Sequence, residues 1–104
     1  MTIDSIFHTM SKDFNAEYAG ELKARVQFVL EDEQWGVIIS QGVLETKKGT
    51  IDKPTLVVTT STNIWIGIRL GTISGLLAMM AGKVKLSGNI EHFKRLQDKK
   101  LFQH

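Results

Sequence analysis

The residues of this chain that could bind a metal ion are few and scattered. Three histidines, His8, His92 and His104, share no spacing typical of metal ligands, and none has an acidic partner at such an interval. The chain contains no cysteine, so thiolate ligands and disulfides are excluded. We therefore expect no metal site, and we expect the histidines at exposed helix or tail positions.

The sequence also contains no recognisable motif for nucleophilic or acid–base catalysis. Residues 59–62 are rich in hydroxyl groups, but no Gly-x-Ser-x-Gly sequence surrounds them, and they are typical of a strand end followed by a helix cap. Asp32, Glu33 and Glu45 form no recognisable acid–base pair. Four glycines are separated by apolar residues, without the lysine of a phosphate-binding loop: Gly67, Gly71, Gly75 and Gly82. The sequence predicts no enzyme and no cofactor.

The composition is that of an ordinary globular domain. The chain has 104 residues, of which 42% are hydrophobic and 23% charged, enough for one domain with one core. Residues 1–14 have no basic leader, and no apolar run approaches the length of about eighteen residues that spans a bilayer. These features predict a cytoplasmic protein.

The net charge of +2 is unevenly distributed. Basic residues outnumber Glu91 and Asp98 in the C-terminal part: Lys83, Lys85, Lys94, Arg95, Lys99 and Lys100. Two interpretations stay open, a solvated helix face or weak attraction to an anionic membrane surface or acidic partner. Nucleic-acid binding needs a denser basic patch with exposed aromatic residues, so we expect no nucleic-acid partner.

Hydrophobic spacing predicts one helix and then several strands in the first sixty residues. Ile3, Ile6, Phe7, Met10 and Phe14 form one helical stripe, with Thr2 or Asp4 as its cap and a loop after Asn15. Apolar and polar residues then nearly alternate over residues 22–31, which is typical of a strand with one buried face. Further strands are expected over residues 35–41, 42–48 and 55–60.

Helices dominate the remaining sequence. Residues 64–70 and 75–81 are expected to be short helices, the second capped by Ser74, and residues 83–87 a last strand. Asn89 is expected to cap a final helix with an apolar stripe that contains Ile90, Phe93 and Leu96. The order of elements predicts an α+β fold, a five-stranded mixed but mostly antiparallel sheet with helices covering one face.

The two middle helices carry a surplus of apolar side chains. Residues 64–70 and 76–80 leave few polar positions on any side of either helix. Such helices are either enclosed in a core or line a pocket, and composition alone leaves both interpretations open. The flexible side chains of Met79 and Met80 slightly favour a pocket that fits ligands of varied shape.

Residues 55–97 resemble the sterol carrier protein type 2 domain, also called non-specific lipid-transfer protein. The similarity is most specific over residues 80–89, Met-Ala-Gly-Lys-Val-Lys-Leu-Ser-Gly-Asn, and residues 35–41 resemble the tryptophan-bearing second strand of the family. The resemblance implies a stand-alone prokaryotic domain with an apolar tunnel between sheet and helices. It also implies binding of fatty acids, fatty acyl-CoA, sterols or other lipids without catalysis. Thr72 stands where the family commonly has a lysine, a departure that bears on acyl-CoA recognition.

On this resemblance we expect twelve apolar residues to contact the lipid: Phe28, Trp35, Val37, Ile39, Trp65, Ile66, Ile68, Leu76, Met79, Met80, Phe93 and Leu96. Exposed backbone groups, with Arg69 or Lys83 at a cavity mouth, are candidates for headgroup contacts.

Three functions are consistent with these features. The first is a lipid-binding carrier for a fatty acid, fatty acyl, sterol or isoprenoid ligand, in transient contact with a membrane surface or a lipid-metabolising enzyme. The second is an accessory scaffold that docks on an enzyme through its basic C-terminal helix and presents an apolar intermediate. The third is a dimerising structural module whose cavity is filled by side chains. The oligomeric state is left open, with a homodimer among the alternatives.

Overall fold

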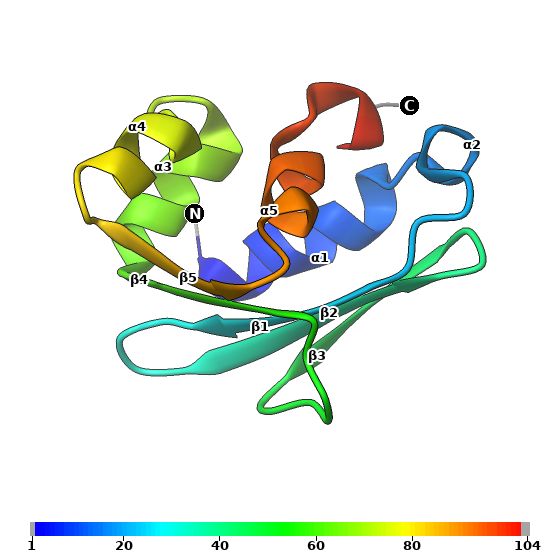
Figure 1. Ribbon diagram of the computed structural model, residues 1–104, viewed down its shortest axis with the longest axis horizontal. Helices are drawn as coiled ribbons and strands as arrows, with labels where there is room; N and C mark the ends of the chain where they lie inside the picture. Colours follow the sequence, from blue (N-terminus) through cyan, green and yellow to red (C-terminus); the bar gives the residue numbers. More distant parts are fainter. Residues whose placement is uncertain (1, 103–104) are drawn as a thin grey trace.

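The computed structural model describes residues 2–102 of the chain. Helices and strands follow one another in this order (Figure 1): α1 (Ile3–Asp13), α2 (Ala16–Ala19), β1 (Ala24–Val29), β2 (Gln34–Ser40), β3 (Val43–Lys48), β4 (Leu56–Thr60), α3 (Thr62–Leu70), α4 (Gly75–Met80), β5 (Val84–Gly88), α5 (Ile90–Gln97) and the 3-10 turn η1 (Lys99–Phe102). Among the described residues, no helix combines the length and the hydropathy that crossing a bilayer requires.

The five strands form one sheet in the order β3-β2-β1-β4-β5. β1 and β4 are parallel, with Val26 opposite Leu56, and the other three neighbouring pairs are antiparallel. The helices α1, α3, α4 and α5 all lie on the same side of the sheet (Figure 1). The predicted mixed, mostly antiparallel sheet with helices over one face is therefore confirmed.

Aromatic rings fill the space between α1 and the sheet. Phe7 of α1 stacks on Trp35 of β2 with ring centroids 4.7 Å apart, and meets Phe28 of β1 edge-on at 5.3 Å. Trp65 of α3 extends this cluster, with its ring centroid 4.5 Å from that of Phe28. Phe7, Phe28 and Trp65 are fully buried. The helical stripe of α1 thus meets the alternating apolar face of β1 and β2, as each pattern requires.

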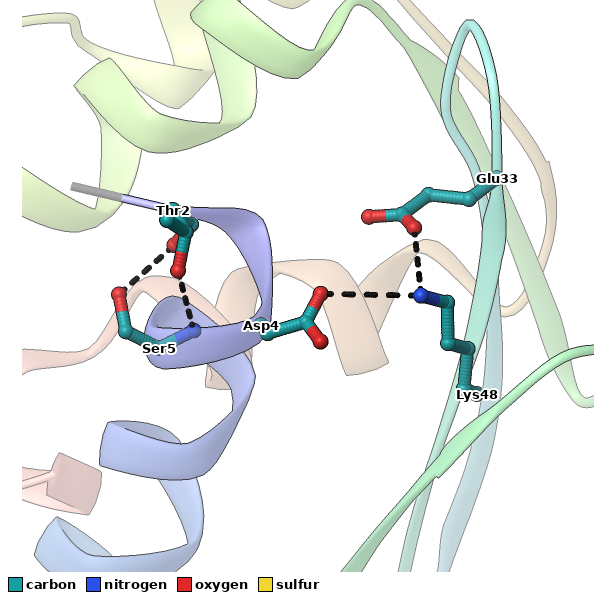
Figure 2. Close-up of polar contacts among 5 residues, drawn as sticks. All are labelled: Thr2, Asp4, Ser5, Glu33 and Lys48. Atoms are coloured by element: carbon teal, nitrogen blue, oxygen red, sulfur yellow. Dashed lines mark hydrogen bonds and ion pairs between the residues drawn. The ribbon is translucent and has the colours of Figure 1, made fainter.

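Polar contacts fix the start of α1 and tie it to the sheet (Figure 2). The Thr2 hydroxyl accepts a hydrogen bond from the Ser5 N–H, so Thr2 is the cap. The Lys48 ammonium lies 3.1 Å from a Glu33 carboxylate oxygen and 3.9 Å from one of Asp4. The hydrogen bond with Glu33 and the nearby Asp4 charge raise the pKa of Lys48.

The opposite face of the sheet is partly covered by the connection between β3 and β4, which the sequence pattern does not indicate. Gln27 is a polar position in the alternation of β1, yet its side chain is buried. The Gln27 amide donates to the carbonyls of Trp35 and Gly49 and accepts from the Ile51 N–H. Ile51 packs on Gly36 so closely that a Cβ there would lie 2.2 Å from Ile51 Cγ2.

Three local expectations need correction. The expected loop after Asn15 contains the short helix α2, because the Asn15 side chain accepts from the Tyr18 N–H and caps it. Ile90, expected on the buried stripe of α5, is 47% exposed. The side chains of α4 are not enclosed: its small residues face inward, and three large apolar residues are 52%, 65% and 73% exposed, namely Leu76, Leu77 and Met80.

Candidate lipid-binding groove

A cavity of about 580 Å³ lies between the end of α3, the start of α4 and the α5–η1 segment. We call it the α3–α5 groove. Its apolar lining comes from Ile68, Leu70, Ile73 and Phe102. Polar side chains complete the wall: Arg69, Ser74, Gln97 and Asp98. The groove therefore combines apolar surface with a few polar groups, which is typical of a site for an amphiphilic ligand.

The turn between α3 and α4 forms one wall of the groove. Gly71 ends α3 with a φ of +84°, a left-handed conformation that glycine adopts without strain. The N–H groups of Thr72 and Ile73 both donate to the Gly67 carbonyl, which folds the turn back onto α3. Ile73 then packs against Gly67, where a Cβ would lie 2.4 Å from Ile73 Cδ1. The absence of a side chain at Gly67 thus makes room for Ile73.

The opposite wall is held by a close contact between α4 and α5. A Cβ on Gly75 would lie 1.9 Å from Gln97 Oε1, so the absence of a side chain at Gly75 makes room for the Gln97 amide. The Gln97 amide also donates to the Phe93 carbonyl at 3.5 Å. Helices α4 and α5 therefore meet at the groove through Gly75 and Gln97.

Arg69 is the basic residue of the groove. Its guanidinium lies over the Phe102 ring, with Cζ 4.4 Å from the ring centroid, a geometry that favours a cation–π interaction. Burial lowers the pKa of Arg69, and the attraction of Asp13 opposes this shift. An arginine nevertheless stays charged at neutral pH, so the groove carries a partly desolvated cation.

Asp98 brings a negative charge to the same groove, but both of its carboxylate oxygens have donors. Tyr18 Oη donates to Oδ2 at 2.6 Å, and the Lys100 N–H donates to Oδ1 at 3.0 Å. The Tyr18 hydrogen bond, with smaller contributions from Lys100 and Arg95, lowers the pKa of Asp98. The Asp98 carboxylate is therefore ionised at neutral pH and engaged with its neighbours.

A second cavity of about 270 Å³ adjoins the groove on the other side of the α3–α4 turn. Ile73 and Ser74 line both cavities, so this turn separates them. The second cavity is otherwise lined by Ile64, Leu77, Ala78, Ala81 and Lys83. Arg69 and Lys83, the candidates for headgroup contacts, each line one of the two cavities.

The twelve predicted lipid contacts occupy three kinds of position. Seven are buried core residues: Phe28, Trp35, Val37, Ile39, Trp65, Phe93 and Leu96. Ile66, Ile68 and Met79 pack against the core and are partly buried, whereas Leu76 and Met80 are exposed. Of the twelve, Ile68 alone lines either of these two cavities. The tunnel between sheet and helices, and the lipid contacts expected in it, stay predictions.

The ligand contacts predicted from the sequence did not include Ile73, Gln97 and Phe102. Ile73 lies in a turn and Phe102 in η1, neither of which was expected to face a cavity. Gln97 follows Phe93 by four residues in α5, so the two side chains share one face of the helix. This spacing is the one feature of the sequence that could have indicated Gln97 as a groove residue.

The histidines take separate positions. Among residues 2–102, no group of three or more side chains of the metal-ligating types comes together. His8 is exposed as expected, but His92 is half-buried, with Nδ1 2.8 Å from Thr55 Oγ1. Burial and the nearby Arg95 charge lower the pKa of His92. His104 lies outside the described residues.

The sequence profile of the alkyl sulfatase C-terminal family matches residues 1–99. No curated protein sequence matches the chain at a significant level. The structure of the stereoselective inverting sec-alkylsulfatase Pisa1 from Pseudomonas sp. superposes with a TM-score of 0.89 and 20% identity. That match covers 100% of this chain but only 17% of Pisa1, so the chain corresponds to a small part of the sulfatase's length.

Sterol carrier domains have the same architecture. Sterol carrier protein 2 from Yarrowia lipolytica, in its apo form, has a TM-score of 0.79 at 19% identity, with 95% of this chain and 91% of that chain covered. Palmitated SCP2L2 from Aedes aegypti has a TM-score of 0.76 at 18% identity, with 100% and 98% covered. The resemblance seen in the sequence is confirmed at the level of the fold: the chain has the fold of sterol carrier protein 2 domains, and it belongs to the alkyl sulfatase C-terminal family.

Proposed function

We propose that this domain binds the hydrocarbon chain of an amphiphile in the α3–α5 groove and carries out no catalysis itself. The observation that carries the proposal is the groove, whose volume of about 580 Å³ lies within the range of ligand sites in proteins. Ile68, Ile73 and Phe102 supply an apolar lining that suits a flexible chain. The palmitated relative from Aedes aegypti shares the fold and supports a lipid-like ligand.

Burial of a hydrocarbon chain supplies the driving force for binding. Each buried CH2 group contributes about 0.8 kcal/mol, so ten such groups supply about 8 kcal/mol before the costs of association. Such binding depends on chain length more than on one specific polar contact. This dependence suits a module that accepts several related amphiphiles.

The groove is a better candidate than the space between α1 and the sheet. Phe7, Phe28 and Trp65 fill that space with ring contacts, so a chain entering there would have to displace them. One feature favours an interior ligand: the indole N–H groups of Trp35 and Trp65 are buried without an acceptor among the described residues. A polar atom of an interior ligand would satisfy them. The two positions can be separated by experiment.

A second candidate function is delivery of an apolar substrate to a catalytic unit. The chain matches a part of Pisa1 that amounts to 17% of that enzyme, so a domain of this type lies within an alkylsulfatase. A domain that holds the alkyl chain beside a catalytic unit would raise the local concentration of substrate. In this arrangement the domain is an accessory that concentrates amphiphiles, and the catalytic groups belong to another unit.

Native mass spectrometry and calorimetry test the binding proposal. Delipidated protein is titrated with neutral alkanols of increasing length, and the affinity is expected to rise about fourfold for each added CH2 until the groove is filled. Ile68→Phe is expected to reduce binding because it fills the groove from α3. Val43→Phe, on an exposed position of β3, is the matched control. Absence of binding to alkanols, fatty acids and sterols would refute the proposal.

A further inference from the structure

We propose that Arg69 recognises the anionic headgroup of the amphiphile, so that the groove prefers a hydrocarbon chain ending in an oxyanion, a carboxylate or a sulfate, to a neutral one. This inference rests on the proposed binding of the hydrocarbon chain in the α3–α5 groove. It adds the chemical class of the headgroup and the residue that selects it.

The position of Arg69 is the first argument. Arg69 lies between Ile68 and Leu70 at the end of α3, and all three line the groove. The stacking of the guanidinium on Phe102 at 4.4 Å holds the charged group beside apolar surface. An oxyanion at Arg69 would therefore leave its hydrocarbon chain against Ile68, Ile73 and Phe102.

The hydrogen-bonding state of Arg69 is the second argument. The guanidinium stacks on Phe102 and is attracted by Asp13, and a single carboxylate leaves several of its N–H donors for another acceptor. The guanidinium has five N–H donors in one plane, which match the two oxygens of a carboxylate or sulfate. Desolvation makes a partly buried cation costly, so an oxyanion that contacts it gains more here than it would at a solvated lysine.

The charges around the groove set a direction for the headgroup. Asp98 repels an anion, although Tyr18 and Lys100 hydrogen-bond its oxygens. Asp13 attracts the Arg69 guanidinium and so competes with the ligand. An anionic headgroup should therefore lie at the Arg69 end, and removal of the Asp98 charge should strengthen its binding.

The test compares three ligands of equal chain length: decanoate, decyl sulfate and decanol. Isothermal titration calorimetry on the unmodified protein is expected to give the two anions about tenfold to hundredfold tighter binding than decanol, the range for hydrogen bonds to charged groups. Arg69→Gln should abolish this preference, so that the variant binds the three ligands with similar affinity. Arg69→Lys should restore part of it, and Asp98→Asn should increase it. Lys94→Gln, on an exposed residue of α5, should have no effect.

The outcomes separate the two proposals. If neither the anions nor decanol bind, the proposed function itself fails. If all three bind equally and Arg69→Gln changes nothing, the groove stands and the role of Arg69 is overturned. Inorganic sulfate alone is the last arm: binding as tight as that of decyl sulfate would show an ion site without hydrocarbon recognition and would also overturn the inference. A thermal unfolding midpoint of Arg69→Gln close to that of the unmodified protein shows that the variant is folded.

Discussion

The two ends of the helical layer differ in how completely they are packed. Under α1, the rings of Phe7, Phe28 and Trp65 are in mutual contact and have no exposed surface. Around α4, the α3–α5 groove and its smaller neighbour leave about 580 Å³ and 270 Å³ unfilled, and large apolar side chains reach the surface. The first region stabilises the fold, whereas the second exposes apolar surface that a ligand could cover.

The difference follows from the lengths and residues of the helices. α1 has 11 residues, enough for one complete apolar stripe against the sheet and a polar face outside. α4 has 6 residues and no charged side chain, and its buried residues are Gly75 and Ala78. A short helix that is apolar on all sides and packs through its small residues leaves its large ones uncovered.

The largest effect is expected from a change in the packed region. Phe7→Ala removes a ring that contacts Phe28, Trp35 and Trp65, and should lower the free energy of unfolding by about 3–5 kcal/mol. Leu77→Ala on α4 is the matched control, with an expected change within about 0.5 kcal/mol because that side chain is mostly exposed. Denaturant unfolding measures both, and similar losses in the two variants would erase the distinction between the regions.

A smaller effect is expected at the partition between the two cavities. Ile73→Ala removes the larger of the two side chains that line both cavities, so the groove and its neighbour should join. A longer hydrocarbon chain then fits, and each additional CH2 group accommodated should tighten binding by about fourfold. Calorimetry with alkanols of increasing length measures the shift. An unchanged optimal length in Ile73→Ala would mean that the chain does not reach this turn.

The pH dependence of stability tests the contact between His92 of α5 and Thr55, the residue before β4. The pKa of His92 is lowered, so between this pKa and the ordinary value of about 6.5 the unfolded chain binds more protons than the folded one. Stability should therefore fall as the pH drops below about 6.5, and it is fully present above that value. His92→Gln should flatten this part of the profile, measured as the thermal midpoint against pH. His8→Gln, on exposed α1 surface, should leave it unchanged.

The smallest effect is expected from the ion pairs at the start of α1 (Figure 2). The pKa of Lys48 is raised, so its contribution is present below the ordinary lysine pKa of about 10.4 and is lost as the pH rises through the higher folded value. Lys48→Met should lower stability slightly at neutral pH and match the unmodified protein at strongly alkaline pH. Lys47→Met, an exposed neighbour on β3, provides the control. Lys48 Nζ also lies 5.9 Å from the centroid of the Trp35 ring, and a difference that persists at alkaline pH would assign the effect to this contact instead.

Most of the fold could be predicted because its elements carry strong local patterns. Alternation along residues 22–31 placed Val26 and Phe28 on the buried face, and Ser61, Ser74 and Asn89 cap helices where hydroxyl and amide residues precede apolar ones. The burial of Gln27 could not be predicted, because it depends on hydrogen bonds to Gly49 and Ile51 across the β3–β4 connection. Such long-range partners leave no periodic signal.

The candidate site was harder to predict than the fold. Apolar composition indicates which residues avoid water, but it does not separate a filled core from a cavity, as the buried Trp65 and the exposed Met80 illustrate. The groove arises where the α3–α4 turn, α5 and η1 meet, and Ile73 and Phe102 reach it through tertiary packing. Arg69 could be proposed from sequence as a headgroup contact because it is a lone cation in an apolar helix.

The position of a bound hydrocarbon chain is the measurement that decides between the two regions. Nuclear Overhauser contacts between the chain protons of decanol and the protein report this position in solution. We expect contacts to the side chains of Ile68, Ile73 and Phe102 in the α3–α5 groove. Contacts to Phe28 and Trp65 instead would place the ligand between α1 and the sheet, and would contradict the assignment of binding to the loosely packed end of the molecule.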